Sequence, residues 1–465
     1  MQTRLARYYL GRLRAANTIY RRGATSSAEG TALLGQEWAQ IAQWQAWAAA
    51  QSRTSAAAAH LCASFAQDGA AILPTRQTPR ERVAWLESGL AAARMLGDAR
   101  AEGVCLLHLA WAIHKETDLD RAEEVAGLAL AQAEMIDDPL LIGQALHLLG
   151  EIAVRRSALE RAEPLFLRSV EQLGSVDAQA ALAEVYFSLS ELTYFLGRPD
   201  EAHAYALQCH EIHRALGLNQ ITNNSLTWLG LMTIEAGDFA RGEQYVRQSE
   251  VLARAAGAQS TLAYTLSTLS ELMLIRKEAD KARRYAEEAQ QIAERVGEAW
   301  LIPGLLVHHG DAAAMAGDYE VALGDVGQAI DCVRANGYRE TLVYALLHLA
   351  DIQLTAGDLE AARAALREGM DAARQAQIYT NLVYGVFVAT KLWRLRDAIR
   401  AAEWAAALSV ARGLDYRERQ DLQGLQAELA GVLGSETYQA AAERGTGLPI
   451  ETAAECILQE LGGPL

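Results

Sequence analysis

The sequence predicts an all-α fold, an α-solenoid in which antiparallel helix pairs recur every 40 residues. Three observations support this class. The chain of 465 residues is rich in alanine, the residue that costs least in a helix, and it holds only 8 prolines. Turns that start a helix recur in phase along the chain, and so do small residues in the helices before those turns. Because one helix pair cannot bury its apolar face alone, the pairs are expected to stack.

The second helix of each predicted pair starts at a recognisable turn. In several units glycine closes one helix and aspartate caps the next, as in Gly237-Asp238, Gly317-Asp318 and Gly357-Asp358. Inside the helix that follows, a small residue recurs at a spacing of 40: Ala122, Ala162, Ala202, Gly242, Ala282, Ala322 and Ala362. A period kept without a slip predicts one repeat array rather than several separate domains.

The first helix of each pair carries a second small residue, called the first-helix marker below. The markers are Ala110, Gly150, Ser190, Gly230, Ser270, Gly310 and Ala350. A small side chain here lets the second helix of the same pair approach closely.

These patterns resemble the tetratricopeptide repeat. Leu226, the pair Leu229-Gly230 and Phe239 match one unit of that repeat. The usual period is about 34 residues, so this chain is similar to the longer form found in kinesin light chains and bacterial signalling ATPases. The resemblance covers residues 58–417, which is nine units, and it implies a right-handed superhelix.

The two ends are expected to cap the array. Residues 1–57 predict a helix pair at about 2–22 and 28–51, and residues 418–465 predict capping helices at about 418–433 and 435–444. Three tryptophans lie in the second N-terminal helix: Trp38, Trp44 and Trp47. Packing against the first repeat is the favoured interpretation, since aromatic side chains dominate burial in cores, and a surface for a partner is the alternative.

The N-terminal segment also resembles a junction in bacterial STAND signalling ATPases of the NB-ARC type. The match consists of ARYYL, a glycine after basic residues, and an acidic and aromatic helix that leads into the repeats. In that family the repeats form the sensor arm behind a nucleotide-binding domain. The resemblance implies a bacterial, cytoplasmic arm, joined to an upstream nucleotide-binding domain if the chain is a fragment. The chain itself contains no GxxxxGK[ST] or GxGxxG motif.

Composition and motifs argue against several other functions. The formal net charge of -16 disfavours a nucleic-acid partner, and no run of 18 apolar residues could span a membrane. The five cysteines form no CxxC pair, which favours a reducing compartment, and no HExxH or GxSxG motif is present. We therefore predict no enzyme activity, no catalytic residue, no metal and no cofactor. His210 and His213 lack a third ligand and are interpreted as a solvated helix face, while His309 is interpreted as a histidine at the edge of the core.

The first helices line the concave groove of tetratricopeptide superhelices, and here this wall is acidic. Five of the eight residues that follow the marker position are Asp or Glu. The expected ligand-binding residues share one helical stripe: Glu191, Asn224, Thr227, Tyr264, Glu271, Asp311, Tyr344 and Asp351. Such a stripe favours a cationic or hydrogen-bond-donating ligand. The alternatives are that these acids pair internally, with an arginine of the adjacent unit, or that they are the residues which tetratricopeptide repeats habitually carry at this position.

The leading hypothesis is a non-enzymatic sensor or interaction arm of a STAND-type signalling ATPase. Its ligand would be a peptide, a protein or a small molecule bound in the concave groove. The alternative is a free-standing tetratricopeptide adaptor that scaffolds other proteins. A third hypothesis is an enzyme with an unrecognised site, because the carboxylates of the groove permit acid–base chemistry.

Overall fold

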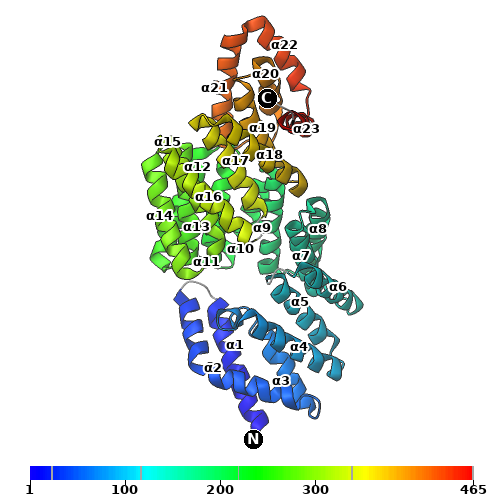
Figure 1. The fold of residues 1–465 in the computed structure, drawn as a ribbon. Helices are drawn as coiled ribbons and strands as arrows, with labels where there is room; N and C mark the ends of the chain where they lie inside the picture. The colour runs from blue at the N-terminus through cyan, green and yellow to red at the C-terminus, as the bar shows by residue number, and fades with distance from the viewer. Residues whose placement is uncertain (22–24, 116–117, 218, 337–338, 463–465) are drawn as a thin grey trace. The chain divides into compact units, whose positions relative to one another are not determined.

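The computed structural model describes residues 1–21, 25–115, 118–217, 219–336 and 339–462, and within these ranges every regular element is a helix. Figure 1 shows the helices in chain order. The predicted all-α solenoid class, built from tetratricopeptide-type helix pairs, is confirmed. No helix in this part of the chain is long and apolar enough to cross a membrane.

The helix pairs keep the predicted register. From α6 to α18, the second helices start at residues that are 40 apart, beginning with Leu119 and Leu159. The first helices are α3 (Ala56–Gln67), α5 (Ala99–Lys115), α7 (Pro139–Arg155), α9 (Gln179–Phe195), α11 (Asn219–Glu235), α13 (Gln259–Ile275), α15 (Ile302–Met315), α17 (Arg339–Ala356) and α19 (Tyr379–Trp393). The second helices are α4 (Pro79–Leu96), α6 (Leu119–Met135), α8 (Leu159–Ser175), α10 (Pro199–Ala215), α12 (Phe239–Ala256), α14 (Ala279–Val296), α16 (Tyr319–Asn336), α18 (Leu359–Ala376) and α20 (Ala398–Val410).

The turns between the helices have the predicted chemistry. Gly237 and Gly357 adopt φ values of 102° and 89°, in the left-handed region that glycine tolerates best. Asp238 and Asp358 then cap α12 and α18, because each carboxylate accepts a hydrogen bond from the backbone N–H three residues on. These turns fix where each second helix begins.

The first-helix markers lie against the second helix, as predicted. A Cβ on Gly230 would stand 2.6 Å from a methyl group of Val246 and 2.9 Å from the carbonyl oxygen of Gly242. Where the marker is serine, the two helices are close enough for its hydroxyl to bond the second helix: Ser270 Oγ donates to the carbonyl of Ala282 at 2.8 Å. The small residues are therefore required by packing within each pair.

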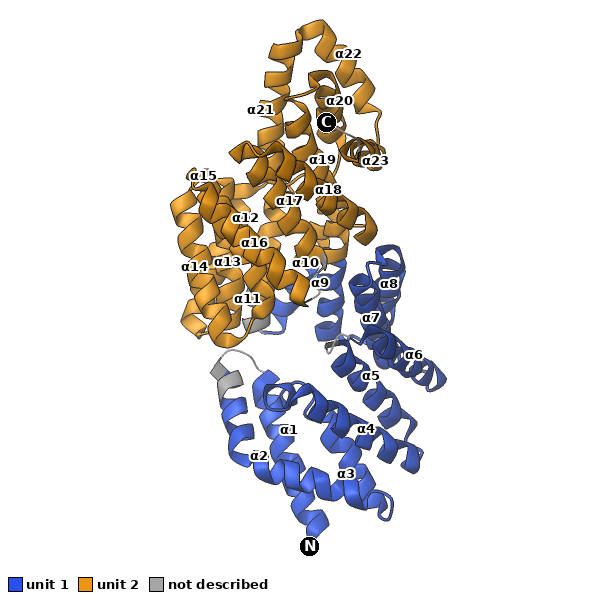
Figure 2. Cartoon of the chain, viewed as in Figure 1, with its two compact units in different colours: residues 1–189, 208–222 blue, residues 190–207, 223–465 orange. Residues whose placement is uncertain are grey.

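The helices form two compact units, coloured separately in Figure 2. Unit 1 contains residues 1–189 and 208–222, and unit 2 contains residues 190–207 and 223–465. The boundaries of these units differ from the predicted boundaries at 57 and 417. The predicted boundaries separate the repeats from the terminal helices, and they stay a prediction.

The N-terminal helices α1 (Gln2–Arg21) and α2 (Thr25–Gln51) belong to unit 1. Trp38 stacks on Trp85 of α4, with ring centroids 5.7 Å apart, and Trp44 meets Trp47 edge to face at 5.8 Å. All three predicted tryptophans are partly buried against the core of unit 1. The contact with Trp85 confirms for Trp38 the interpretation that it packs against the first repeat, whereas the contact between Trp44 and Trp47 lies within α2.

Unit 2 ends in three helices, α21 (Tyr416–Leu433), α22 (Ser435–Thr446) and α23 (Ile450–Leu461). The first of them starts earlier than predicted. The reason is a capping box, in which the Asp415 carboxylate accepts from the N–H of Glu418 and the Glu418 carboxylate accepts from the N–H of Asp415. This cap brings two carboxylates, and Arg417 between them, to the N-terminal end of α21.

Candidate ligand-binding site

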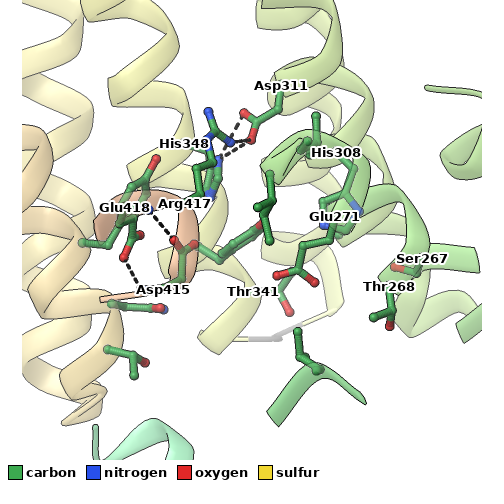
Figure 3. A pocket seen from close by; sticks show the side chains of 18 of the residues that line it. Ser267, Thr268, Glu271, His308, Asp311, Thr341, His348, Asp415, Arg417 and Glu418 are labelled. Atoms are coloured by element: carbon green, nitrogen blue, oxygen red, sulfur yellow. Dashed lines mark hydrogen bonds and ion pairs between the residues drawn. The ribbon is translucent and has the colours of Figure 1, made fainter. Parts of the chain in front are cut away.

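A cavity of about 390 Å³ lies within unit 2. Its wall is built by the first helices α9, α11, α13, α15, α17 and α19, together with residues at the start of α21. Figure 3 shows acidic, histidine and hydroxyl side chains gathered around this cavity. A pocket of this size, lined by aromatic and polar groups, has the dimensions of a small-ligand site.

Five of the eight predicted groove residues line the cavity. They are Tyr264, Glu271, Asp311, Tyr344 and Asp351. Within one helix, Tyr264 and Glu271 are separated by two helical turns and therefore share a face of α13. The spacing argument thus places these five side chains on the face of the first helices that lines the cavity, and their role in binding a ligand stays a prediction.

Three predicted residues do not line the cavity: Glu191, Asn224 and Thr227. Thr227 is a correction to the predicted stripe, because its side chain is fully buried and its Oγ1 lies 2.8 Å from Ser249 Oγ. In α11 this side chain faces the second helix of the pair, whereas Ser267 and Phe387, at the equivalent position of α13 and α19, line the cavity. Asn224 is exposed and Glu191 is half-buried, and neither lines the cavity.

The stripe is completed by residues two positions before the markers, which sequence reasoning missed. Trp228, Thr268, His308 and His348 occupy this position, and all four line the cavity. A signal for them was present, since His308 and His348 are 40 residues apart in the same register. In α11, for example, the predicted residue was Thr227, and the residue that lines the cavity is the next one, Trp228.

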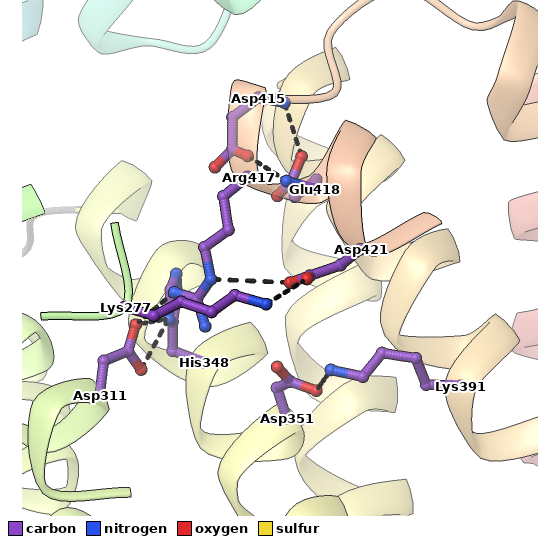
Figure 4. Close-up of polar contacts among 9 residues, drawn as sticks. All are labelled: Lys277, Asp311, His348, Asp351, Lys391, Asp415, Arg417, Glu418 and Asp421. Carbon is purple, nitrogen blue, oxygen red and sulfur yellow. Dashed lines mark hydrogen bonds and ion pairs between the residues drawn. The ribbon is translucent and has the colours of Figure 1, made fainter. Parts of the chain in front are cut away.

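Two of the predicted carboxylates are neutralised by the chain itself. Asp311 Oδ2 lies 2.9 Å from His348 Nδ1 and 3.6 Å from Arg417 Nη1, and Asp351 pairs with Lys391 (Figure 4). Burial alone would raise the pKa of Asp311, but the charges of His348 and Arg417 hold this pKa below its usual value. At these two positions the acid pairs internally with a basic residue of the next repeat, which is His348 for Asp311 and Lys391 for Asp351.

Glu271 differs from both. Within the described ranges its carboxylate makes no hydrogen bond and no ion pair. Burial and the negative charge of Asp415 raise the pKa of Glu271 to about 7, against the opposing effect of His348. Unlike Asp311 and Asp351, Glu271 is not paired with a basic side chain of the described residues.

His308 has an unsatisfied ring nitrogen at the same cavity. The side chain is 6% exposed, and its Nδ1 has no hydrogen-bond partner in the part of the chain that the structure describes. Burial lowers the pKa of His308 to about 4, so the ring is neutral at physiological pH. An unpaired polar atom that is this deeply buried is costly unless something else satisfies it.

The start of α21 lies against the repeats of unit 2. Arg419 donates to the backbone carbonyl of Glu235 at 2.9 Å, and the ring of Tyr416 lies 5.2 Å from that of Phe239. Asp421 also accepts from Lys277 at 3.2 Å, as Figure 4 shows. Burial raises the pKa of Glu235, Asp415 and Glu418, and Asp415 and Glu418 line the cavity.

The histidines that the sequence singled out lie away from the cavity. His213 is buried, with its Nδ1 3.6 Å from Cys209 Sγ, so the interpretation as a solvated helix face is wrong for this residue. His309 is partly buried and its Nδ1 lies 2.5 Å from Asp325 Oδ2, which is the expected core-edge position. Among the residues described, no group of three or more histidine, cysteine or acidic side chains could hold a metal ion.

Known proteins resemble this chain only distantly. A family profile described as Anaphase-promoting complex subunit 5 matches residues 309–394, and no curated protein sequence matches the chain. A Rap protein complexed with competence and sporulation factor is 13% identical, with a TM-score of 0.44, over 88% of this chain and 99% of that one. NprR in complex with its cognate peptide NprX is 12% identical, with a TM-score of 0.45, over 77% of this chain and 98% of that one. A STAND protein with a tetratricopeptide repeat sensor from Pyrococcus horikoshii is 11% identical, with a TM-score of 0.42, over 87% of this chain and 74% of that one. At these identities the similarity concerns the fold.

Proposed function

We propose that this chain is a non-enzymatic binding module and that the cavity of unit 2 receives its ligand. The observation that carries the proposal is that the cavity contains polar groups which the chain leaves unpaired. Glu271 makes no ion pair or hydrogen bond, and the Nδ1 of His308 has no hydrogen-bond partner, among the described residues. A bound ligand would satisfy both groups and offset the cost of burying them.

The aromatic lining supports binding in the same place. The ring of Tyr344 lies 4.2 Å from that of His348, which in turn lies 5.0 Å from Tyr384. Tyr264 contacts Trp300, a half-exposed residue that also lines the cavity. Tyrosine and tryptophan offer rigid contact area at a low cost in conformational entropy, as a recognition surface requires.

We further propose that this module is the sensor or interaction arm of a bacterial, cytoplasmic STAND-type ATPase. The resemblance of the N-terminal segment to the STAND junction supports this. The ligand is a peptide, a protein or a small molecule that reaches the cavity. The alternative is an adaptor that acts without an ATPase. An open reading frame that encodes a P-loop domain in frame upstream supports the first assignment, and a native start at Met1 supports the second.

The binding role can be tested by filling the cavity. Gly304 lines it, and a Cβ built on this residue meets nothing within 4 Å, so Gly304→Phe extends a bulky side chain from the cavity wall. Gly324→Phe is the matched control, because Gly324 is an exposed helix residue with the same free space that does not line the cavity.

The measurement is native mass spectrometry of the purified chain, combined with a thermal-shift screen of peptides and small metabolites. The wild-type chain and Gly324→Phe should bind the same ligand, whereas Gly304→Phe should lose it. Binding that survives Gly304→Phe, or a wild-type chain that binds nothing in either assay, contradicts the proposal.

A further inference from the structure

We infer that the ligand of this cavity is an organic cation whose protonated amine binds Glu271 and which also forms a hydrogen bond with His308. The inference rests on the proposed function and names the chemical class of the ligand. The amine could belong to a free small molecule or to a lysine side chain of a peptide, because both present the same ammonium group.

The first argument is the charge balance along the acidic stripe. Asp311 and Asp351 each pair with a basic residue of the chain, but Glu271 has no such partner within the described residues. Of the two charged groups in the cavity wall that act on its pKa, Asp415 is itself acidic and raises it, and His348, which lowers it, is paired with Asp311. An anionic ligand would be repelled here, and a neutral one would leave the carboxylate uncompensated.

The basic groups already in the cavity do not fill this role. Arg417 is directed to Asp311, at 3.6 Å, and to Asp421, at 3.9 Å. Lys391 is held by Asp351, and its Nζ lies 5.4 Å from the ring centre of Phe387. Figure 4 shows Arg417 and Lys391 in contact with these acidic partners.

The second argument is the set of rings around Glu271. Tyr264 and Tyr344 line the same cavity as Glu271, and the charge of Glu271 adds to burial in raising the pKa of both phenols. Aromatic faces attract alkylammonium ions through their quadrupole, most strongly when water is excluded. The lining therefore suits an organic cation better than a metal ion, for which the described residues provide no group of ligands.

The third argument is independent of charge. His308 lines the cavity with a buried and unpartnered Nδ1, and α15, which carries it, contacts α13, which carries Glu271. Both side chains are drawn at the cavity in Figure 3. A neutral imidazole gives the ligand one more hydrogen bond, and it adds no positive charge that would oppose an ammonium group.

The test uses two pairs of probes that differ only in charge. The first pair is putrescine and its diacetyl derivative. The second pair is the peptide acetyl-Gly-Gly-Lys-Gly-Gly-amide and the same peptide with acetyl-lysine. Affinity for the full chain is measured by isothermal titration calorimetry at low salt and pH 8. At least one amine should bind, and its acetylated partner should not.

Glu271→Gln should weaken amine binding by about 10- to 100-fold, as expected for a lost hydrogen bond to a charged group. Glu320→Gln is the control, because Glu320 is exposed and does not line the cavity. His308→Phe should weaken the same probe with no change in charge at Glu271. Circular dichroism shows whether each variant is folded.

The outcomes separate the possible sources and the two proposals. A response to putrescine alone assigns a free amine, and a response to the lysine peptide alone assigns a peptide. If neither amine binds, or if Glu271→Gln binds as well as the wild type, the inference is overturned. If Gly304→Phe still blocks an uncharged ligand in that case, the binding role stands and only the ligand class is wrong.

Discussion

Arg417, at the start of α21, places its Nη1 3.6 Å from Oδ2 of Asp311 in α15, so a helix after the last repeat pair neutralises an acid of the groove. His348 completes the arrangement by contacting the same carboxylate at 2.9 Å. Asp311 is almost fully buried. Removing a basic partner from a buried carboxylate leaves a charge that the protein compensates poorly.

Arg417→Ala should therefore lower the free energy of unfolding by roughly 1–3 kcal/mol. Breaking a fully buried ion pair costs more than this, but the Arg417 side chain is partly exposed. Urea denaturation at pH 7 measures this change. The control is Arg396→Ala, which removes an exposed arginine whose side chain has no partner in the described ranges. Equal effects of the two substitutions would show that the pair with Asp311 contributes nothing.

Glu271 should make the chain less stable as the pH rises from about 4.5 to about 7. Its usual pKa is 4.5 and its folded pKa is about 7, so within this window the folded chain holds a proton that the unfolded chain has lost. The free energy of unfolding then falls with rising pH. The titratable groups that interact with Glu271 are Tyr194, Glu235, Tyr264, Tyr344, His348 and Asp415.

Glu271→Gln removes this contribution, so the variant should be more stable than the wild type at pH 8 by roughly 1–3 kcal/mol. The difference should vanish near pH 4.5. Asp311 has a lowered pKa, so its stabilising effect is lost only at lower pH, below this window. Thermal denaturation of both chains from pH 4.5 to pH 8 measures the effect, and parallel curves would contradict it.

The close contact at Gly230 gives a test of the repeat packing. A Cβ at this position would meet Val246 and the backbone of Gly242 at less than 3.0 Å, so Gly230→Ala should lower the free energy of unfolding by roughly 1–3 kcal/mol. Gly324→Ala is the control, since its Cβ meets nothing within 4 Å. There alanine should stabilise by up to about 1 kcal/mol. Urea midpoints that move in the same direction would refute the assignment of Gly230 as a packing position.

The helices and their packing could be predicted because they repeat. Each turn and each marker, such as Gly230 or Ser270, is defined by a local pattern that recurs 40 residues later. The same period predicted which face of the first helices lines the cavity. The exception is α11, where Thr227 was predicted to line it and the next residue, Trp228, does so. Periodicity thus specifies which helix face lines the groove.

The roles of Asp415, Arg417 and Glu418 could not be predicted in this way. They lie beyond the last repeat pair, and no periodic pattern links them to the acids that they approach in α15 and α11. The choice between internal pairing and ligand binding therefore depended on a tertiary contact. The structure shows internal pairing at Asp311, whereas Glu271, one repeat earlier, lacks it.

This difference predicts opposite effects for the same charge reversal at two neighbouring positions of the stripe. A lysine at position 271 would lie near the acid Asp415, and its positive charge would break no ion pair of the described residues. A lysine at position 311 would instead face His348 and Arg417. Glu271→Lys should therefore keep or raise the stability at pH 8 while abolishing amine binding. Asp311→Lys should lower the stability by about 3 kcal/mol, because it breaks a buried pair and adds a like charge. Urea denaturation of both variants measures the two effects, and calorimetry with the amine probe checks the first. If Glu271→Lys is as destabilising as Asp311→Lys, the carboxylate of Glu271 is already compensated in the wild-type chain, and the charge argument for a cationic ligand fails.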